Sequence, residues 1–98
     1  MSRTEEAMKA YEHLSLHISR EVRDLLENRK ILREDLQRTI HQAETTGEKF
    51  VNFFTGRSLA FLRPDRVTYW VEYRKIDEIY LIYSAYCHRM EMKRGQGL

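Results

Sequence analysis

Apolar residues in the first half of the chain recur at steps of mostly three and four. The series begins at Met8 and ends at Ala43, and the charged residues fall mostly off it. This spacing places the apolar side chains along one stripe of a helix. Residues 1–46 also contain neither glycine nor proline, the two strongest helix breakers. The pattern therefore predicts a helical part over residues 1–46, and Ser2–Glu5 has the form of a capping box at its start.

The stripe lapses over Glu27–Lys30, where no apolar residue occurs. A single helix of about 40 residues would be about 60 Å long and would overhang any sheet that the rest of the chain can form. A helical hairpin, or a sharply bent helix, would bury the stripe within the chain. We favour this second geometry because a short domain needs compactness. Against it, neither glycine nor proline marks the break.

The second half of the chain has the aromatic and β-branched composition of strands. Gly47 fits the left-handed residue that follows a helix end. The predicted fold is α+β, with an N-terminal helical hairpin or one long bent helix packed on a three- to four-stranded antiparallel β-sheet. The strands are expected at Ser58–Leu62, Val67–Tyr73 and Ile79–Arg89, with turns at Arg63–Arg66 and Lys75–Glu78.

One domain is expected to span residues 1–98, with the helical part at 1–46, the antiparallel strands at 50–92 and a flexible basic tail at 93–98. In an antiparallel pairing with a five-residue loop, Tyr73 lies opposite Ile79 and Val71 opposite Leu81. The apolar face so formed is assigned to the helices. Cys87 extends this face, as a buried and inert thiol.

The opposite face of the sheet has a mixed composition. It is too apolar for a solvated surface and too polar for a core, which is typical of a binding surface. The alternative is that the apolar run Phe50–Phe54, or a second copy of the chain, packs across this face. The residues predicted to bind a partner are Trp70, Glu72, Tyr80, Tyr86 and His88, with Arg89 as a charged anchor at the edge.

Composition limits the function classes. Hydrophobic residues make up 42% of the 98 residues, which is enough for a core, and the formal charge is +2. The single cysteine excludes an internal disulfide and fits a reducing compartment. The first residues lack the apolar run of a signal peptide, and no window is apolar enough to span a membrane. We therefore expect a soluble, cytoplasmic protein that does not act at a membrane.

Catalytic and metal-binding patterns are weak. His13 and His17 would share one side of a helix with Glu21, but a solvated polar face explains them better. Cys87 and His88 are adjacent on a strand, so they point to opposite faces and cannot act as nucleophile and base. Glu72 and His88 would be too far apart for one acid–base pair. Neither a cofactor nor an enzymatic activity is expected.

Nucleic-acid binding is an alternative use of the same sheet face. Aromatic side chains on a sheet with arginines at its margin can stack single-stranded bases. The near-neutral net charge and the acidic residues Glu72, Asp77 and Glu78 argue against it. The arginines concerned are Arg57, Arg63, Arg66 and Arg74, which flank strands that carry Phe61, Tyr69, Trp70 and Tyr80.

The segments TYWVEY (Thr68–Tyr73) and AYCHRM (Ala85–Met90) resemble a short segment of small accessory regions of anaerobic redox proteins. The resemblance covers a small part of the chain, carries no catalytic residue, and is not accompanied by a cysteine cluster for an iron–sulfur centre. It implies an accessory subunit. The expected function is therefore a small non-catalytic interaction protein, either an accessory subunit or an adaptor. It would self-associate or dock on a larger, possibly redox, partner through the aromatic sheet face and the helix stripe.

Overall fold

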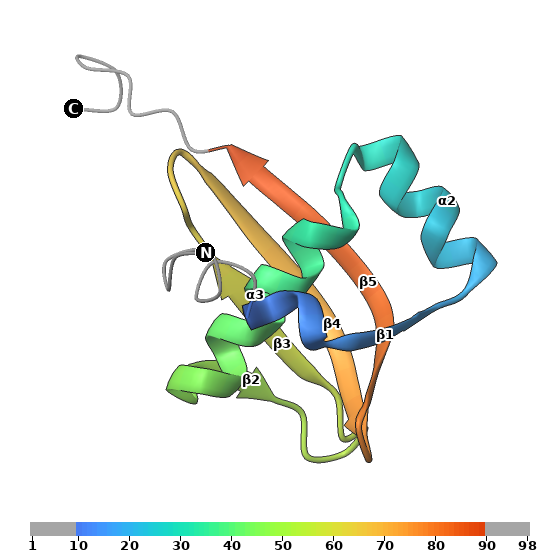
Figure 1. Cartoon of the computed structure of the whole chain (residues 1–98), viewed down its shortest axis with the longest axis vertical. Helices are drawn as coiled ribbons and strands as arrows, with labels where there is room; N and C mark the ends of the chain where they lie inside the picture. The colour runs from blue at the N-terminus through green and yellow to red at the C-terminus, as the bar shows by residue number, and fades with distance from the viewer. Residues whose placement is uncertain (1–9, 90–98) are drawn as a thin grey trace, which may run out of the picture.

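The computed structural model describes residues 10–89 and shows an α+β fold in which two α-helices pack on a five-stranded sheet (Figure 1). The predicted fold class is thus confirmed, with more strands than expected. The strand order is β1-β5-β4-β3-β2, and every neighbouring pair is antiparallel except β1 and β5. The elements are η1 (Ala10–His13), β1 (Ser15–Ile18), α2 (Arg20–Arg29), α3 (Arg33–Thr46), β2 (Lys49–Val51), β3 (Ser58–Leu62), β4 (Val67–Ile76) and β5 (Ile79–Arg89).

The predicted helix is wrong over residues 14–19, whereas Ala10–His13 form a short 3₁₀ helix. Leu16 and Ile18 of β1 are partly buried, whereas Ser15 and His17 are exposed. That alternation is a strand pattern, and the four-residue step from Leu14 to Ile18 fits a helix equally well. The strand is formed by parallel pairing with β5, which is distant in sequence. The predicted capping box at Ser2–Glu5 and the basic tail at 93–98 lie outside the described residues.

The break between the two helices lies where the stripe lapses, as predicted. Ser19 caps the start of α2 by accepting a hydrogen bond from the Val22 N–H at 3.2 Å. Lys30 ends α2 in the left-handed conformation, with φ of 57°. At the start of α3 the Asp35 carboxylate accepts a bond from the Leu32 N–H at 2.9 Å. Gly47 ends α3 with φ of 81°, which confirms its predicted role.

The apolar stripe of the helices is buried against one face of the sheet. Leu36, Ile40 and Ala43 of α3 are completely buried, and α2 contributes Val22 and Leu26. In Figure 1, α3 crosses the sheet over β3 and β4, while α2 lies beside β5. The core is completed from the sheet by Ala60, Val71, Tyr73, Tyr80, Ile82 and Ala85. The apolar stripe of the helices is therefore buried within the chain.

The predicted register between the last two strands is wrong. The strands continue to a tight turn at Asp77–Glu78, where Asp77 has φ of 57°. Val71 pairs with Ala85, and Tyr73 pairs with Ile82. A bulge leaves Tyr83 without a partner, because Glu72 pairs with Ser84 and its neighbour Tyr73 pairs two residues earlier in β5.

The bulge exchanges the faces of β5 partway along the strand. On its turn side, Tyr80 and Ile82 point toward the helices and are buried. Beyond the bulge, Ala85 is the residue that points toward the helices. The prediction that Tyr80 and Ile82 lie on the face opposite the helices was therefore wrong, since it assumed unbroken alternation along β5.

Tyr73 joins three elements in the core. Its hydroxyl donates a hydrogen bond of 2.5 Å to Glu44 of α3, and Lys49 of β2 donates to the same carboxylate oxygen at 2.7 Å. Burial and then the bond to Glu44 raise the pKa of Tyr73 far above its usual value. Burial alone would raise the pKa of Glu44, but the bonds from Lys49 and Tyr73 outweigh it and the pKa is lowered.

Replacing Tyr73 with Phe should lower the free energy of unfolding by about 1–3 kcal/mol at neutral pH, because a buried bond to a charged acceptor is lost. Urea unfolding followed by circular dichroism measures it. Tyr11→Phe is the matched control, since the Tyr11 hydroxyl donates to Glu34 at 2.6 Å on the surface. An equal loss in both variants would contradict the role assigned to Tyr73.

The wild type and Tyr73→Phe should also differ in how the free energy of unfolding depends on pH. Tyr73 has a raised pKa when folded, so its contribution is complete below the unfolded pKa of about 10 and is lost as pH rises beyond it. Above about pH 10, the wild type should therefore lose stability faster than Tyr73→Phe. Parallel loss in the two proteins would show that another group controls alkaline unfolding.

Candidate functional site

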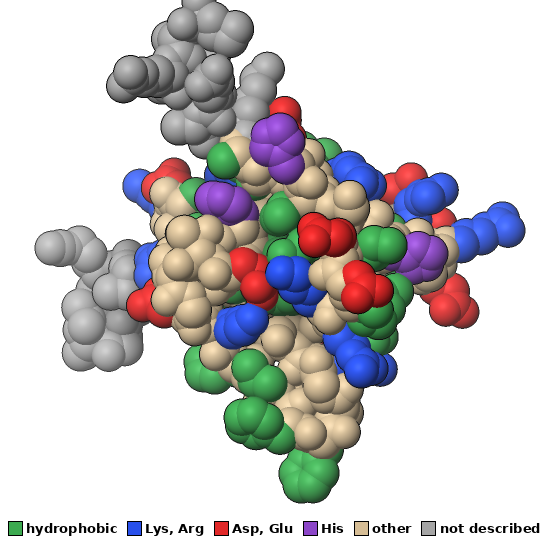
Figure 2. All heavy atoms as spheres, turned by 60° about the horizontal axis from the view of Figure 1, so that its bottom comes forward, with side chains coloured by type: hydrophobic (Ala, Val, Ile, Leu, Met, Phe, Trp, Pro, Cys, Tyr) green, Lys and Arg blue, Asp and Glu red, His purple; other side chains and the backbone are tan. Residues whose placement is uncertain are grey.

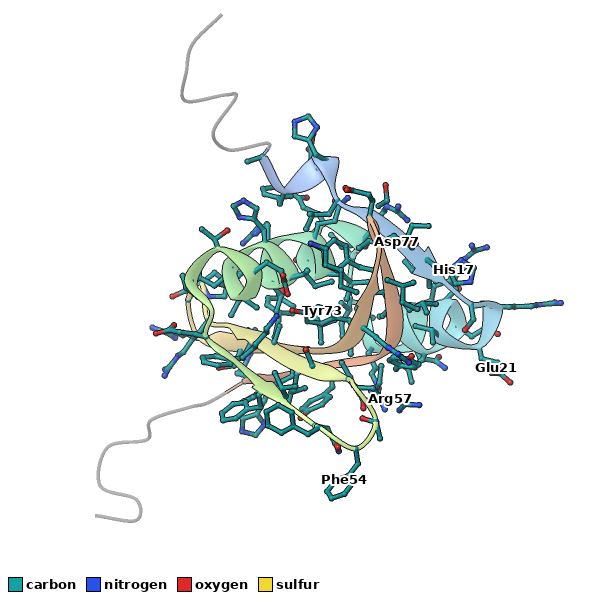
Figure 3. All side chains as sticks on the ribbon, turned by 90° about the horizontal axis from the view of Figure 1, so that it is seen from below. His17, Glu21, Phe54, Arg57, Tyr73 and Asp77 are labelled. Carbon is teal, nitrogen blue, oxygen red and sulfur yellow. The ribbon has the colours of Figure 1, made fainter. Side chains whose placement is uncertain are left out.

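The face of the sheet opposite the helices carries no further layer within the described residues. In Figure 3, Tyr73 lies on the helix side of the sheet, whereas Arg57 and Phe54 lie on the other side. We call this second side the open face. It combines four aromatic rings, an ion pair and a loop with two exposed phenylalanines. It is the surface that the sequence predicts to bind a partner.

Four aromatic rings cross the open face as a continuous ladder from β2 to β5. Phe61 lies opposite Trp70 in the β3–β4 pairing, and Trp70 lies opposite Tyr86 in the β4–β5 pairing. The ring centroids of Phe50 and Phe61 are 5.9 Å apart, those of Phe61 and Trp70 5.5 Å, and those of Trp70 and Tyr86 6.1 Å. Each distance is within the favourable range for aromatic pairs, which contribute about 0.5–1.5 kcal/mol beyond burial.

An ion pair lies beside the ladder. The Arg57 guanidinium donates to Glu72 at 3.3 Å and lies over the Tyr83 ring, 3.8 Å from its centroid. The bulge places Tyr83 where this cation–π contact can form. Glu72 itself lies between Leu59 and Ser84 in the sheet register. Its carboxylate is thus paired with a cation on this face of the sheet.

The β2–β3 loop is tightly organised although its apolar side chains are exposed. The Asn52 side chain accepts bonds from the N–H groups of Phe54 and Thr55, at 2.9 and 3.2 Å. The Asn52 carbonyl accepts from the Gly56 N–H at 2.7 Å, and Gly56 has φ of 78°. Phe53 is nevertheless 92% exposed and Phe54 101%. The loop therefore holds two aromatic side chains in solvent without burying either.

A hollow of about 670 Å³ lies between this loop and the sheet. Its floor is formed by Leu59, Glu72, Ser84 and Tyr86, and its wall by the segment from Phe50 to Phe54. Arg57 lies at its margin. Figure 2 shows hydrophobic side chains projecting at the lower end of the molecule, while charged side chains are mixed above them. The volume is within the range of small-molecule sites, which is about 300–1,000 Å³.

The structure brings together four of the six predicted binding residues. Trp70, Glu72, Tyr86 and His88 lie on the open face, since Trp70 pairs with Tyr86 and Thr68 pairs with His88. Tyr80 lies in the core against Tyr73, with ring centroids 5.8 Å apart, so it is not part of this surface. Arg89 is exposed at the end of β5, and strand alternation turns it away from His88.

Three residues that complete the open face were named from the sequence, but their roles in the ladder and the ion pair were not predicted. Phe50 and Phe61 extend the ladder, and Arg57 holds Glu72. The run Phe50–Phe54 was a usable signal, because it was expected to cover this face. Only Phe50 joins the ladder, whereas Phe53 and Phe54 point into solvent.

Cys87 is exposed, which corrects the prediction of a buried thiol. It pairs with Tyr69 near the end of β5, and in Figure 1 this end of the strand extends past the helices. The helix-facing side of β5 thus extends as far as Cys87, but the helices do not cover it there (Figure 1). Cys87 and His88 point to opposite faces, as predicted from their adjacency.

The three polar residues considered for metal binding lie on separate elements. His13 ends η1, His17 lies in β1 and Glu21 lies in α2. Within residues 10–89, no three His, Cys, Asp or Glu side chains gather in a way that could hold a metal ion. Neither α2 nor α3, the α-helices of the described range, has the length and apolar composition required to cross a membrane.

Comparisons of the chain with protein-family models, with curated proteins and with solved structures gave no match. The case for a function therefore depends on the geometry of the open face.

Because Cys87 is exposed, native protein should react with a thiol reagent such as dithionitrobenzoate at a rate close to that of urea-unfolded protein. The chain has one cysteine, so the signal is unambiguous, and Cys87→Ser is the blank. Reaction only at the rate of global unfolding would show that the thiol is covered.

Proposed function

We propose that this chain is a small non-catalytic interaction protein, an accessory subunit or adaptor that docks on a protein through the open face. The observation that carries the proposal is the aromatic ladder continued by the exposed pair Phe53 and Phe54. Aromatic and arginine side chains are the usual energetic centres of protein interfaces. The helix stripe has no part in the proposal, because it is buried in the core.

The loop that carries Phe53 and Phe54 supports this function for a second reason. Association is weakened by the entropy lost when loops and side chains become ordered. Here the Asn52 hydrogen bonds already hold the backbone of the loop. A partner would gain the apolar contact without first ordering this segment.

Single-stranded nucleic acid is the second candidate for the same face. The Trp70 and Tyr86 rings are nearly parallel, with an angle of 15°, which suits stacking of successive bases. A Cβ on Gly56 would lie 3.5 Å from Nε of Arg74, so this arginine lies against the loop beside the hollow. The carboxylate of Glu72, however, lies on the face where phosphates would run, and Arg57 is already engaged by it.

A photo-crosslinking amino acid at Tyr86, introduced in cells of the native host, distinguishes these functions. The expected result is a discrete protein adduct that survives nuclease treatment. Leu32, which is 63% exposed at the start of α3 on the helix side, is the control position and should give no adduct. An adduct that nuclease removes would assign the face to nucleic acid. Absence of any adduct at Tyr86, or the same adduct at both positions, would refute the proposal.

A further inference from the structure

A knob and a hollow lie side by side on the open face. The knob is the exposed pair Phe53 and Phe54, and the hollow is the space of about 670 Å³ beside it. Both belong to the same surface patch, since these two residues also form part of the wall of the hollow. We infer that the partner is a second copy of this chain, which inserts its knob into the hollow of the first while receiving the first copy's knob. This inference rests on the proposed function and names the partner.

Two-fold symmetry requires a patch that is complementary to itself. In such an interface, residue i of one copy contacts residue j of the other, and j contacts i. A knob next to a hollow on one surface meets this condition, because a rotation of 180° places each knob against the other copy's hollow. A knob without a hollow would fit only an unlike partner.

The floor of the hollow suits a phenylalanine pair. Leu59 and Tyr86 provide apolar contact, and the Phe50 ring of the wall belongs to the ladder. The one carboxylate of the floor, Glu72, is held by Arg57, so each copy brings a paired charge to the centre. Two identical faces therefore meet without like-charge repulsion at this point.

The exposed aromatic area is a large part of what a stable dimer needs. At about 200 Å² per ring, Phe50, Phe53 and Phe54 together expose about 500 Å². A standard interface buries about 800 Å² per partner, so these three rings supply more than half of it. Tyr86, which is 43% exposed, lies on the same hollow and adds to this area.

The test is the mass of the full chain in solution, measured by sedimentation velocity over a dilution series from micromolar to millimolar concentration. The expected species is a dimer of twice 11.9 kDa. The double substitution Phe53→Ser and Phe54→Ser should raise the dissociation constant by more than about tenfold. Both side chains are in solvent in the single chain, so the variant keeps its fold, which circular dichroism verifies.

Two further variants locate the contact. Ser84→Arg fills the floor of the hollow without touching the knob, and it should weaken the dimer as the knob variant does. Leu32→Ser removes an exposed apolar residue outside the open face and should leave the dimer unchanged. A dimer that survives both the knob and the hollow variants uses another surface and overturns the inference.

A wild-type chain that stays monomeric at millimolar concentration also overturns it. The proposed function is decided separately, since an adduct with a different protein at Tyr86 supports docking even when the chain is monomeric. If a chain ending at Arg89 dimerises while the full chain does not, residues 90–98 of the same chain are the occupant of the hollow, in place of a second copy. A monomer that cosediments with phosphatidylcholine–phosphatidylserine vesicles through Phe53 and Phe54 would assign the knob to a lipid surface.

Discussion

Two short helices can cover only one face of a five-stranded sheet, and the rest of this structure depends on that limit. Helices α2 and α3 bury their apolar stripe on one face, where Tyr73 joins α3, β2 and β4 through Glu44 and Lys49. The other face has to be solvated, covered by another part of the chain or occupied by a partner. Its rings and exposed phenylalanines make plain solvation unfavourable. Apolar area left in water lacks the stabilisation of about 25 cal/mol per Å² that burial provides.

The open face is stabilised from within even without a partner. Ring-to-ring contacts run from Phe50 to Tyr86, and Arg57 bridges Glu72 and Tyr83. These contacts fix the positions of side chains that an interface would otherwise have to order. The surface therefore resembles a preformed recognition surface, in which little entropy remains to be lost on association.

The sequence allowed the fold class, the helix break and the bounds of β3 and β5 to be predicted, because each depends on local signals. Glu27–Lys30 interrupts the stripe, and Ser58–Leu62 lies between two turns. The predictions that failed depend on non-local pairing or on the bulge in the sheet. The spacing of Leu14 and Ile18 suits a helix and a strand alike, and only the β5 edge decides between them. No residue type signals the bulge beside Tyr83, so Tyr80 was assigned to the wrong face of the sheet.

The parallel pairing of β1 with β5 has a consequence for the order of assembly. β1 is the first strand of the described chain, and its only neighbour in the sheet is the last one. During synthesis, β1 cannot pair until β5 has left the ribosome. Until then the backbone donors and acceptors of β1 have no partner strand. Contacts of such high sequence separation slow folding and expose intermediates to aggregation. We therefore expect folding to begin at the β4–β5 hairpin, whose pairing is local. The β1 edge of the sheet should form last.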